Sequence, residues 1–311
     1  MICNRETLLT ACVALALFVA IQVFIFAISY KNLRNDIIQE AYLGRRVYPY
    51  RNISGQLPSA LIIGVRKGGT RALLDALNLH PNIRTVRKET HFFDINYSKG
   101  LQWYKENMPV TDGKQIVIEK TPGYFTSPLA PERVFNLNPK MKVIVILRDP
   151  VQRTVSDFTQ VYYNKLETNK TLPIFEEEVF IPGTKELNLS YKPIRNSIYH
   201  MHLTNWLKFF PINQILFVNG DVFRGNPLSE IRKVENFLQL PASVSIDQLV
   251  FNEKKGFFCF LKTPTSSLRC LGSSKGRTHR QIPSNILEVL RKQLIPFNNK
   301  FYKQINRIYS W

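Results

Sequence analysis

The chain has 311 residues, of which 42 are Lys or Arg and 23 are Asp or Glu, so its formal net charge is +19. A hydrophobic content of 44% is that of a folded protein and excludes a wholly disordered basic chain. A folded surface with this charge favours polyanionic partners, such as nucleic acid, an anionic membrane or a sulfated sugar. The length allows one large α/β domain or two small ones.

The N-terminal region contains an uncharged apolar segment, residues 8–30, which is long enough to span a bilayer. It lacks the shorter apolar core and small-residue cleavage site of a signal peptide, which favours an uncleaved signal anchor. Residues 1–7 then form a cytoplasmic tail, residues 31–56 a stem and residues 57–311 the folded domain. Four glycosylation sequons after the anchor, at Asn52, Asn96, Asn169 and Asn188, favour exposure to the secretory lumen.

From residue 57 onward, strands and helices alternate, which predicts an α/β fold with a central parallel sheet flanked by helices. The first predicted strand, residues 61–63, runs into a glycine-rich turn and then into good helix formers. This pattern is typical of a loop that binds an anion through backbone N–H groups at a helix N-terminus. Thr70 and Arg71 stand where a nucleoside-triphosphate P-loop has its Lys and its magnesium-binding hydroxyl, and the only Lys of the loop is Lys67. We therefore expect an anion site without magnesium; a tight turn with incidental basic residues is the alternative.

The next segment, residues 85–94, contains Glu89, His91 and Asp94 beside Phe92 and Phe93. If it is extended, Glu89 and His91 point to the same side. Titratable groups beside apolar residues are typical of an acid–base site. The alternative is a surface ion pair or helix cap with a semi-buried histidine.

Two further basic residues follow predicted strands. Lys120 follows the apolar strand 115–119, and Arg148 follows the buried strand 142–147. Because the carboxyl ends of parallel strands face the ligand crevice, we expect a functional position for Lys120, with a solvated lysine as the alternative. Arg148 is expected at the same sheet edge as the glycine-rich turn, at a second phosphate position. Farther on, the sequence predicts a helix within 198–210 with Trp206 in the core, a strand at 214–218 and a helix at 226–240.

The four cysteines divide into two groups. Cys3 and Cys12 lie in or beside the apolar segment, whereas Cys259 and Cys270 belong to the folded domain and flank a polar segment that contains proline. No further Cys or His pair completes a metal site. A disulfide, which would stabilise the fold by roughly 2–3 kcal/mol, and two buried thiols both remain open. A basic, glycine-containing loop follows at residues 272–280.

Five short motifs occur in a fixed order, at residues 63–71, 89–94, 119–122, 147–150 and 275–277. Together they resemble a heparan sulfate glucosaminyl 3-O-sulfotransferase, of a type 1-like branch, over roughly residues 57–311. The resemblance implies a P-loop-like sulfotransferase fold that uses 3′-phosphoadenylyl sulfate (PAPS) as sulfuryl donor and requires no metal.

The resemblance also implies roles for individual residues. Glu89 matches the catalytic base, with Lys67, His91, Asp94 and Lys120 as its catalytic neighbours. The residues expected to bind PAPS are Lys67, Gly68, Gly69, Thr70, Arg71, Arg148, Ser156, Phe258, Lys275, Gly276, Arg277, Thr278 and His279. The residues expected to contact the glycan are Arg66, Arg71, Lys120, Gln160, Asn164, Lys275 and Arg277. Phe258 departs from the family pattern, which has Tyr there; the expected contact to the nucleotide is then stacking without a hydroxyl.

The same resemblance predicts heparan sulfate as the polymeric partner, no nucleic acid, and a monomeric enzyme. Residues 8–30 would anchor it in the Golgi membrane as a single-pass type II protein with a lumenal catalytic domain. Three alternatives remain open: a sulfotransferase for another position, glycan or small molecule; a nucleoside kinase or NTPase; and a membrane-anchored glycosaminoglycan binder without enzymatic activity.

Overall fold

A computed structural model describes residue 22 and residues 55–263, 265–272 and 278–311. By its internal contacts the chain divides into two units, residues 1–53 and 54–311. The expected tail, anchor and stem, the Asn52 sequon, and Lys275, Gly276 and Arg277 lie outside the described residues, apart from residue 22 and the last two residues of the stem. Within the described ranges, no helix combines the length and apolar character needed to cross a membrane.

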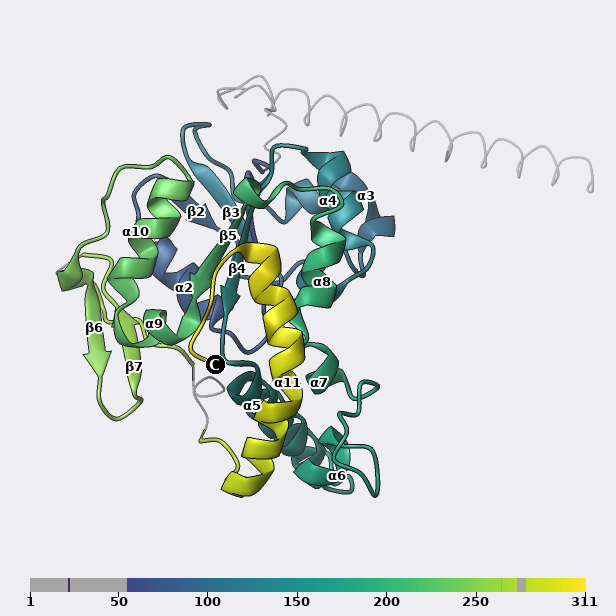
Figure 1. Ribbon diagram of the computed structural model, residues 1–311. Coiled ribbons are helices and arrows are strands. Elements are labelled where there is room, and N and C mark those ends of the chain that lie inside the picture. The colour runs from purple at the N-terminus through teal and green to yellow at the C-terminus, as the bar shows by residue number, and fades with distance from the viewer. Residues whose placement is uncertain (1–21, 23–54, 264, 273–277) are drawn as a thin grey trace, which may run out of the picture. The chain divides into compact units, whose positions relative to one another are not determined.

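Five parallel strands form the central sheet of the second unit (Figure 1), which confirms the predicted parallel sheet. In chain order they are β1 (Ala60–Gly64), β2 (Ile83–Thr85), β3 (Ile116–Lys120), β4 (Lys142–Leu147) and β5 (Ile215–Asn219). Their spatial order is β2-β3-β1-β4-β5. The strands β2 and β3 therefore lie on one side of β1, and β4 and β5 lie on the other side. Ligands of open α/β sheets bind beyond the carboxyl ends of the strands at such a switch point.

Helices cover both faces of this sheet because successive strand residues face opposite sides (Figure 1). Ile62 and Ile144 pack with α2 (Thr70–Leu77) and α10 (Pro227–Phe237), whereas Leu61 and Val143 pack on the other face. That second face is covered by α3 (Gly100–Glu106), α4 (Ala130–Leu137), α8 (Tyr199–Trp206) and α11 (Ser284–Ile305). Trp206 is fully buried there, which confirms its prediction as a core residue.

The remaining helices are short, apart from α5. They are α5 (Pro150–Glu167), α6 (Phe175–Val179), α7 (Lys192–Arg195) and α9 (Gly220–Gly225), with 3₁₀ turns η1 (Tyr97–Lys99), η2 (Tyr124–Thr126), η3 (Ile212–Gln214) and η4 (Ile246–Gln248). Apolar residues of α5, α6, α7 and α11 form a third core cluster. This cluster anchors α5, whose first turn follows directly on β4 and Arg148.

A two-stranded antiparallel hairpin, β6 (Leu249–Asn252) and β7 (Phe257–Phe260), follows α10. Cys259 in β7 forms a disulfide with Cys270, and their Cα atoms are 4.3 Å apart. Phe260 and Arg269 also exchange backbone hydrogen bonds of 2.7 and 2.8 Å. The segment that leads to residue 272 is therefore held against the hairpin by one covalent and two hydrogen bonds.

Candidate active site

The glycine-rich turn lies between β1 and α2, at the carboxyl end of the central strand. Gly69 has a φ of +107° at the N-cap of α2, and Gly68 donates its N–H to the Val65 carbonyl at 2.9 Å. A Cβ atom on Gly68 would lie 2.6 Å from the carbonyl oxygen of Ile146, so only glycine fits there. The tight backbone at a helix N-terminus gives the loop the geometry of an anion site.

Two basic groups from distant parts of the sequence lie at this loop. Arg148, directly after β4, donates from Nη1 to the Lys67 carbonyl at 3.4 Å. Burial lowers the pKa of Arg148, and the charge of Asp221 opposes that effect. His279 lies within electrostatic reach of Arg148 and Lys67, and burial together with these charges lowers its pKa to about 4. The structure thus brings Lys67, Arg148 and His279 together at one edge of the sheet.

A buried ion-pair network joins the glycine-rich loop to helix α5. Asp157 of α5 accepts from Arg66 Nε and from Arg153 Nη1, each at 2.9 Å. Arg153 is fully buried and also donates to the Arg66 carbonyl at 3.3 Å and to Ser197 Oγ at 2.6 Å. Arg66, which the sequence predicts as a glycan contact, therefore has a structural partner here, while its side chain remains half exposed.

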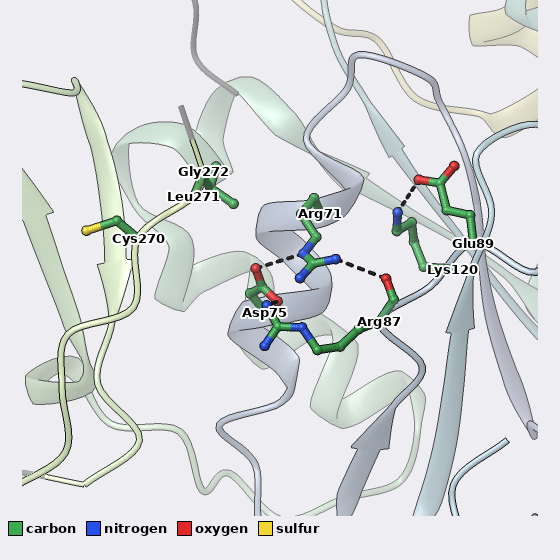
Figure 2. A pocket seen from close by; sticks show the side chains of 8 residues that line it. All are labelled: Arg71, Asp75, Arg87, Glu89, Lys120, Cys270, Leu271 and Gly272. Carbon is green, nitrogen blue, oxygen red and sulfur yellow. Dashed lines mark hydrogen bonds and ion pairs between the residues drawn. The ribbon is translucent and has the colours of Figure 1, made fainter. Parts of the chain in front are cut away.

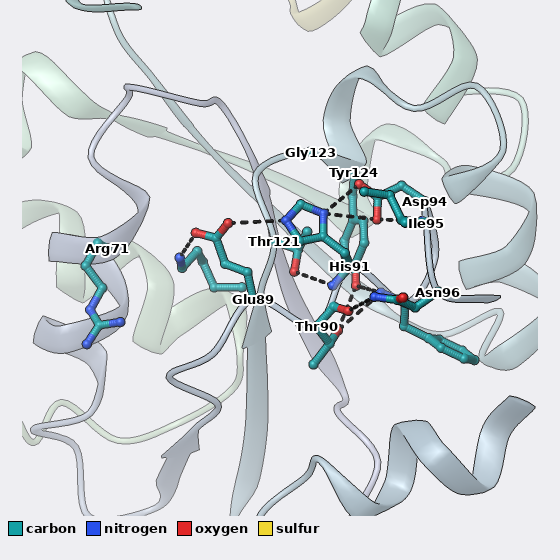
Figure 3. Close-up of polar contacts among 12 residues, drawn as sticks. Arg71, Glu89, Thr90, His91, Asp94, Ile95, Asn96, Thr121, Gly123 and Tyr124 are labelled. Carbon is teal, nitrogen blue, oxygen red and sulfur yellow. Dashed lines mark hydrogen bonds and ion pairs between the residues drawn. The ribbon is translucent and has the colours of Figure 1, made fainter. Parts of the chain in front are cut away.

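The four residues Glu89, His91, Asp94 and Lys120 form one polar network at the carboxyl end of β3. Figure 3 shows the His91 ring between the carboxylates of Glu89 and Asp94. Lys120 Nζ donates to Glu89 Oε1, and Glu89 Oε2 lies 3.5 Å from His91 Nε2. His91 Nδ1 lies 2.9 Å from Asp94 Oδ2 on its other side. The segment is not the extended strand on which the sequence prediction depends, since His91 has a φ of +50°. The contact between Glu89 and His91 therefore comes from this turn and not from the alternation of a strand.

The backbone that carries this network is held by Thr90 and Tyr124. The two hydroxyl oxygens are 3.0 Å apart, and the Tyr124 oxygen accepts the Phe92 N–H at 2.9 Å. Asn96 Nδ2 donates to the Thr90 carbonyl at 2.8 Å. The nitrogen that would carry a glycan at the Asn96 sequon therefore already donates a hydrogen bond to the protein backbone.

Sequence reasoning gave no role to Glu119, which precedes Lys120 in β3. Its side chain is fully buried, Oε1 accepts from Thr121 Oγ1 at 2.5 Å, and Oε2 has no hydrogen-bond partner among the described residues. Burial raises the pKa of Glu119 to about 7, against hydrogen bonding by Thr121 and the charge of Lys120. Thr121 Oγ1 also accepts the His91 N–H at 3.4 Å, so Glu119 is linked to the site through one hydroxyl.

A pocket opens beside Glu89 and Lys120 (Figure 2). Arg71, Asp75 and Arg87 line it opposite these two residues, and residues 270–272 complete it. Arg71 thus lines the same cavity as Glu89, and its contact to an acceptor stays a prediction. The pocket has a volume of about 200 Å³, which is below the roughly 300–1,000 Å³ of pockets that enclose a drug-sized ligand. The pocket therefore accommodates only part of a large ligand.

Other predicted residues lie outside this cluster. Gln160 Nε2 donates to Asn164 Oδ1 at 2.7 Å on an exposed face of α5, and Ser156 is buried in the same helix. The Phe258 ring packs against Phe251 with centroids 5.2 Å apart. Their contacts to nucleotide or glycan stay predictions. Within the described ranges, no group of three or more His, Cys, Asp or Glu side chains is arranged to hold a metal ion.

Comparison with known proteins gives a consistent result. The family model of the sulfotransferase domain matches residues 57–292. Heparan sulfate glucosamine 3-O-sulfotransferase 5 of Mus musculus is 46% identical over 82% of this chain and 74% of its own length. Heparan sulfate glucosamine 3-O-sulfotransferase 3B1 of Homo sapiens is 44% identical over 83% of this chain and 66% of its own length.

Among solved structures, a sulfotransferase from Alicyclobacillus acidocaldarius has the same fold, with a TM-score of 0.62. The match covers 82% of this chain and 98% of that one at 19% identity. The chain therefore belongs to the sulfotransferase family, in the group of the heparan sulfate glucosamine 3-O-sulfotransferases.

Proposed function

We propose that the protein transfers a sulfuryl group from PAPS to the 3-hydroxyl of glucosamine residues in heparan sulfate. The names of the relatives support the reaction and the acceptor. The structural observation that carries the proposal is the position of Glu89. Its carboxylate is held by Lys120 and His91 at a cation-lined pocket, beyond the same sheet edge as the glycine-rich loop. The type 1-like branch stays a prediction.

The loop region fits the donor because it combines backbone N–H groups with desolvated cations. Gly68 and Gly69 allow a close approach of an anion to the backbone, and Lys67 and Arg148 supply positive charge for phosphate groups. Thr70, Arg71, Ser156, Phe258, Thr278 and His279, together with residues 275–277 outside the described ranges, complete the proposed nucleotide site. When bound, PAPS supplies the sulfuryl group: a bond forms from sulfur to the acceptor oxygen, the bond from sulfur to the 5′-phosphate oxygen breaks, and its electron pair leaves with the bisphosphate.

The chain itself contributes a base and its positioning. Glu89 takes the proton of the acceptor hydroxyl as that oxygen forms its new bond. Lys120, whose side chain is only 4% exposed, donates to one carboxylate oxygen and so holds the base in a single orientation. His91 lies beside the other oxygen, and Asp94 in turn orients His91. Correct placement of a base near the reacting hydroxyl is a large part of catalysis in displacements of this kind.

We further propose heparan sulfate as the polymeric partner of a monomeric, Golgi-anchored enzyme with its catalytic domain in the lumen. The formal charge of +19 supports electrostatic attraction of a polyanion, which weakens as salt is added. The disulfide between Cys259 and Cys270 supports an oxidising compartment. Of the sequons in the described ranges, Asn169 lies on an exposed turn after α5 and is the proposed site for a glycan.

The deciding experiment measures transfer of labelled sulfate from PAPS to heparan sulfate by the full chain and by Glu89→Gln, followed by disaccharide analysis. We expect label at the glucosamine 3-hydroxyl and a loss of turnover of about 10²–10⁴-fold in the variant, the range for removal of a general base. PAPS binding should be unchanged. Glu132→Gln, an exposed carboxylate on α4, is the matched control. Label at another position would show that the acceptor is not the glucosamine 3-hydroxyl. Turnover of Glu89→Gln within a few-fold of wild type would show that Glu89 is not the base.

A further inference from the structure

Arg87 has no role in the reaction described above, yet it lines the same pocket as Glu89. The local backbone explains why. Val86 continues along β3 after β2 has ended, since its N–H donates to the Ile118 carbonyl at 3.0 Å and its side chain is buried in the core. In an extended segment the next side chain faces the opposite way. Arg87 therefore leaves the core and reaches the pocket, two residues before Glu89.

Two arginines share one carboxylate on this wall of the pocket (Figure 2). Asp75 Oδ2 accepts from Arg71 Nε at 2.9 Å, and Asp75 Oδ1 lies 3.9 Å from Arg87 Nη2. Arg71 Nη1 also donates to the Arg87 carbonyl at 3.0 Å. The helix α2 and the segment after β2 thus hold both guanidinium groups in place before any ligand arrives, which lowers the entropy cost of binding.

The two arginines differ in how much bonding capacity they retain. The Arg71 side chain is 25% exposed and already makes two hydrogen bonds. The Arg87 side chain is 56% exposed, and its contact to Asp75 is long. A guanidinium has five N–H donors in a planar fork that matches sulfate and carboxylate groups. Arg87 therefore keeps donors that can reach an anion in the pocket.

The positive charge of Arg87 can offset the negative charge of Glu89 when an anionic acceptor binds. Glu89 must accept a proton from a hydroxyl of a polyanion, and its negative charge repels the anionic groups on that polymer. Like charges placed together across a contact oppose binding, and a complementary cation offsets them. Lys120 already donates to Glu89, and the other cations that line the pocket are Arg71 and Arg87 on the opposite wall.

We propose that Arg87, held by Asp75 beside Arg71, forms a subsite for an anionic substituent of the sugar next to the acceptor glucosamine, either a sulfate ester or a carboxylate. Arg87 thereby determines which acceptors bind well. The proposal rests on the glycan acceptor proposed above, but it concerns recognition of the acceptor and not the sulfuryl transfer itself.

The test compares Arg87→Ala, Arg87→Lys and Lys88→Ala in the full chain. Lys88 is the neighbouring exposed cation and does not line the pocket, so it controls for the loss of one positive charge. Equilibrium binding of defined heparan sulfate oligosaccharides is measured without donor, and KM and kcat are measured with PAPS. Three acceptors are used: one fully substituted, one lacking the sulfate ester on the neighbouring sugar, and one with that sugar's carboxyl group reduced.

We expect Arg87→Ala to weaken binding and raise KM for the full acceptor by about 10-fold or more, the loss of one charge-assisted hydrogen bond, with kcat little changed. Arg87→Lys should restore only part of this, because a point charge lacks the planar fork. The penalty should disappear for whichever acceptor lacks the recognised group, which identifies sulfate or carboxylate. An effect equal to that of Lys88→Ala, or the same penalty on all three acceptors, would overturn the proposal. Because binding is measured without donor, a wild-type protein that binds the acceptors but transfers no sulfate would refute the enzyme function separately.

Discussion

Replacing Glu119 with glutamine tests the physical state of the carboxyl group beneath the site. The side chain is completely buried, and burial raises its pKa from 4.5 to about 7. Glutamine has nearly the same shape and can keep the contact with Thr121, but it carries no charge. We predict that Glu119→Gln stabilises the protein relative to wild type at pH 8 and does so much less at pH 5.

The sign and size follow from the pKa difference between the folded and unfolded chains. A carboxyl group whose pKa is higher in the folded state favours folding while it is protonated. That stability is fully present below about pH 4.5 and is lost as the pH rises through about 7. The difference between 4.5 and about 7, at 1.36 kcal/mol per pKa unit, corresponds to a cost of about 3 kcal/mol at pH 8. Most of this cost is absent at pH 5.

Urea unfolding of both proteins at pH 5, 6.5 and 8 measures the effect as a free energy of unfolding. The stability gained by the variant should be about 2–3 kcal/mol larger at pH 8 than at pH 5. Glu253→Gln, at an exposed turn of the hairpin, provides the control and should show almost no such trend. If Glu119→Gln changes stability by the same amount at every pH, or destabilises the protein most at pH 8, Glu119 is not held neutral by burial.

Two further predictions concern the loop and the nucleotide site. Asp157→Asn leaves the buried Arg153 guanidinium without its carboxylate, so we expect a loss of about 3–5 kcal/mol of stability; an unchanged urea midpoint would contradict this. Because burial and neighbouring cations hold the pKa of His279 near 4, a bisphosphate bound at Lys67 and Arg148 should raise it and cause proton uptake between about pH 4.5 and 6. Calorimetry in buffers of different ionisation enthalpy detects this proton uptake, and His279→Gln should abolish it. Equal binding heats in all buffers for the wild-type protein would disprove the prediction.

Much of the sheet could be predicted because its strands carry strong local signals. Residues 142–147 are an apolar run, and β4 occupies this range with every residue after Lys142 buried. The predicted strands 115–119 and 214–218 are each displaced by one residue from β3 and β5. The helix predicted at 226–240 is shorter, because Asn226 caps it through the Ser229 N–H and it ends at Phe237.

The elements that sequence reasoning missed have weaker or conflicting signals. The 22-residue helix α11 contains Pro296, and an internal proline ordinarily marks the end of a helix. Packing of Leu290, Leu294 and Phe301 into two core clusters holds it together nonetheless. The strands β6 and β7 have only four residues each, which is too short for a clear alternating pattern.

For the site, the sequence by itself determined the chemistry that each segment can perform. The glycines of the loop after β1 predict an anion site because of their backbone freedom. Residue type and motif predict a catalytic role for Glu89, His91, Asp94 and Lys120. The excess of basic residues indicates a polyanionic partner whatever the fold.

Only the tertiary structure decided which of these groups meet. The register of β1 with β3 and β4 places Ile62 opposite both Lys120 and Ile144, and so aligns the ends of three strands that are far apart in the chain. Packing at that edge pairs Lys120 with Glu89, buries Glu119 and turns Arg87 into the pocket. Burial and contact depend on neighbours that are distant in sequence, and for that reason the pKa of Glu119 and the place of Arg87 have no signature in the local pattern.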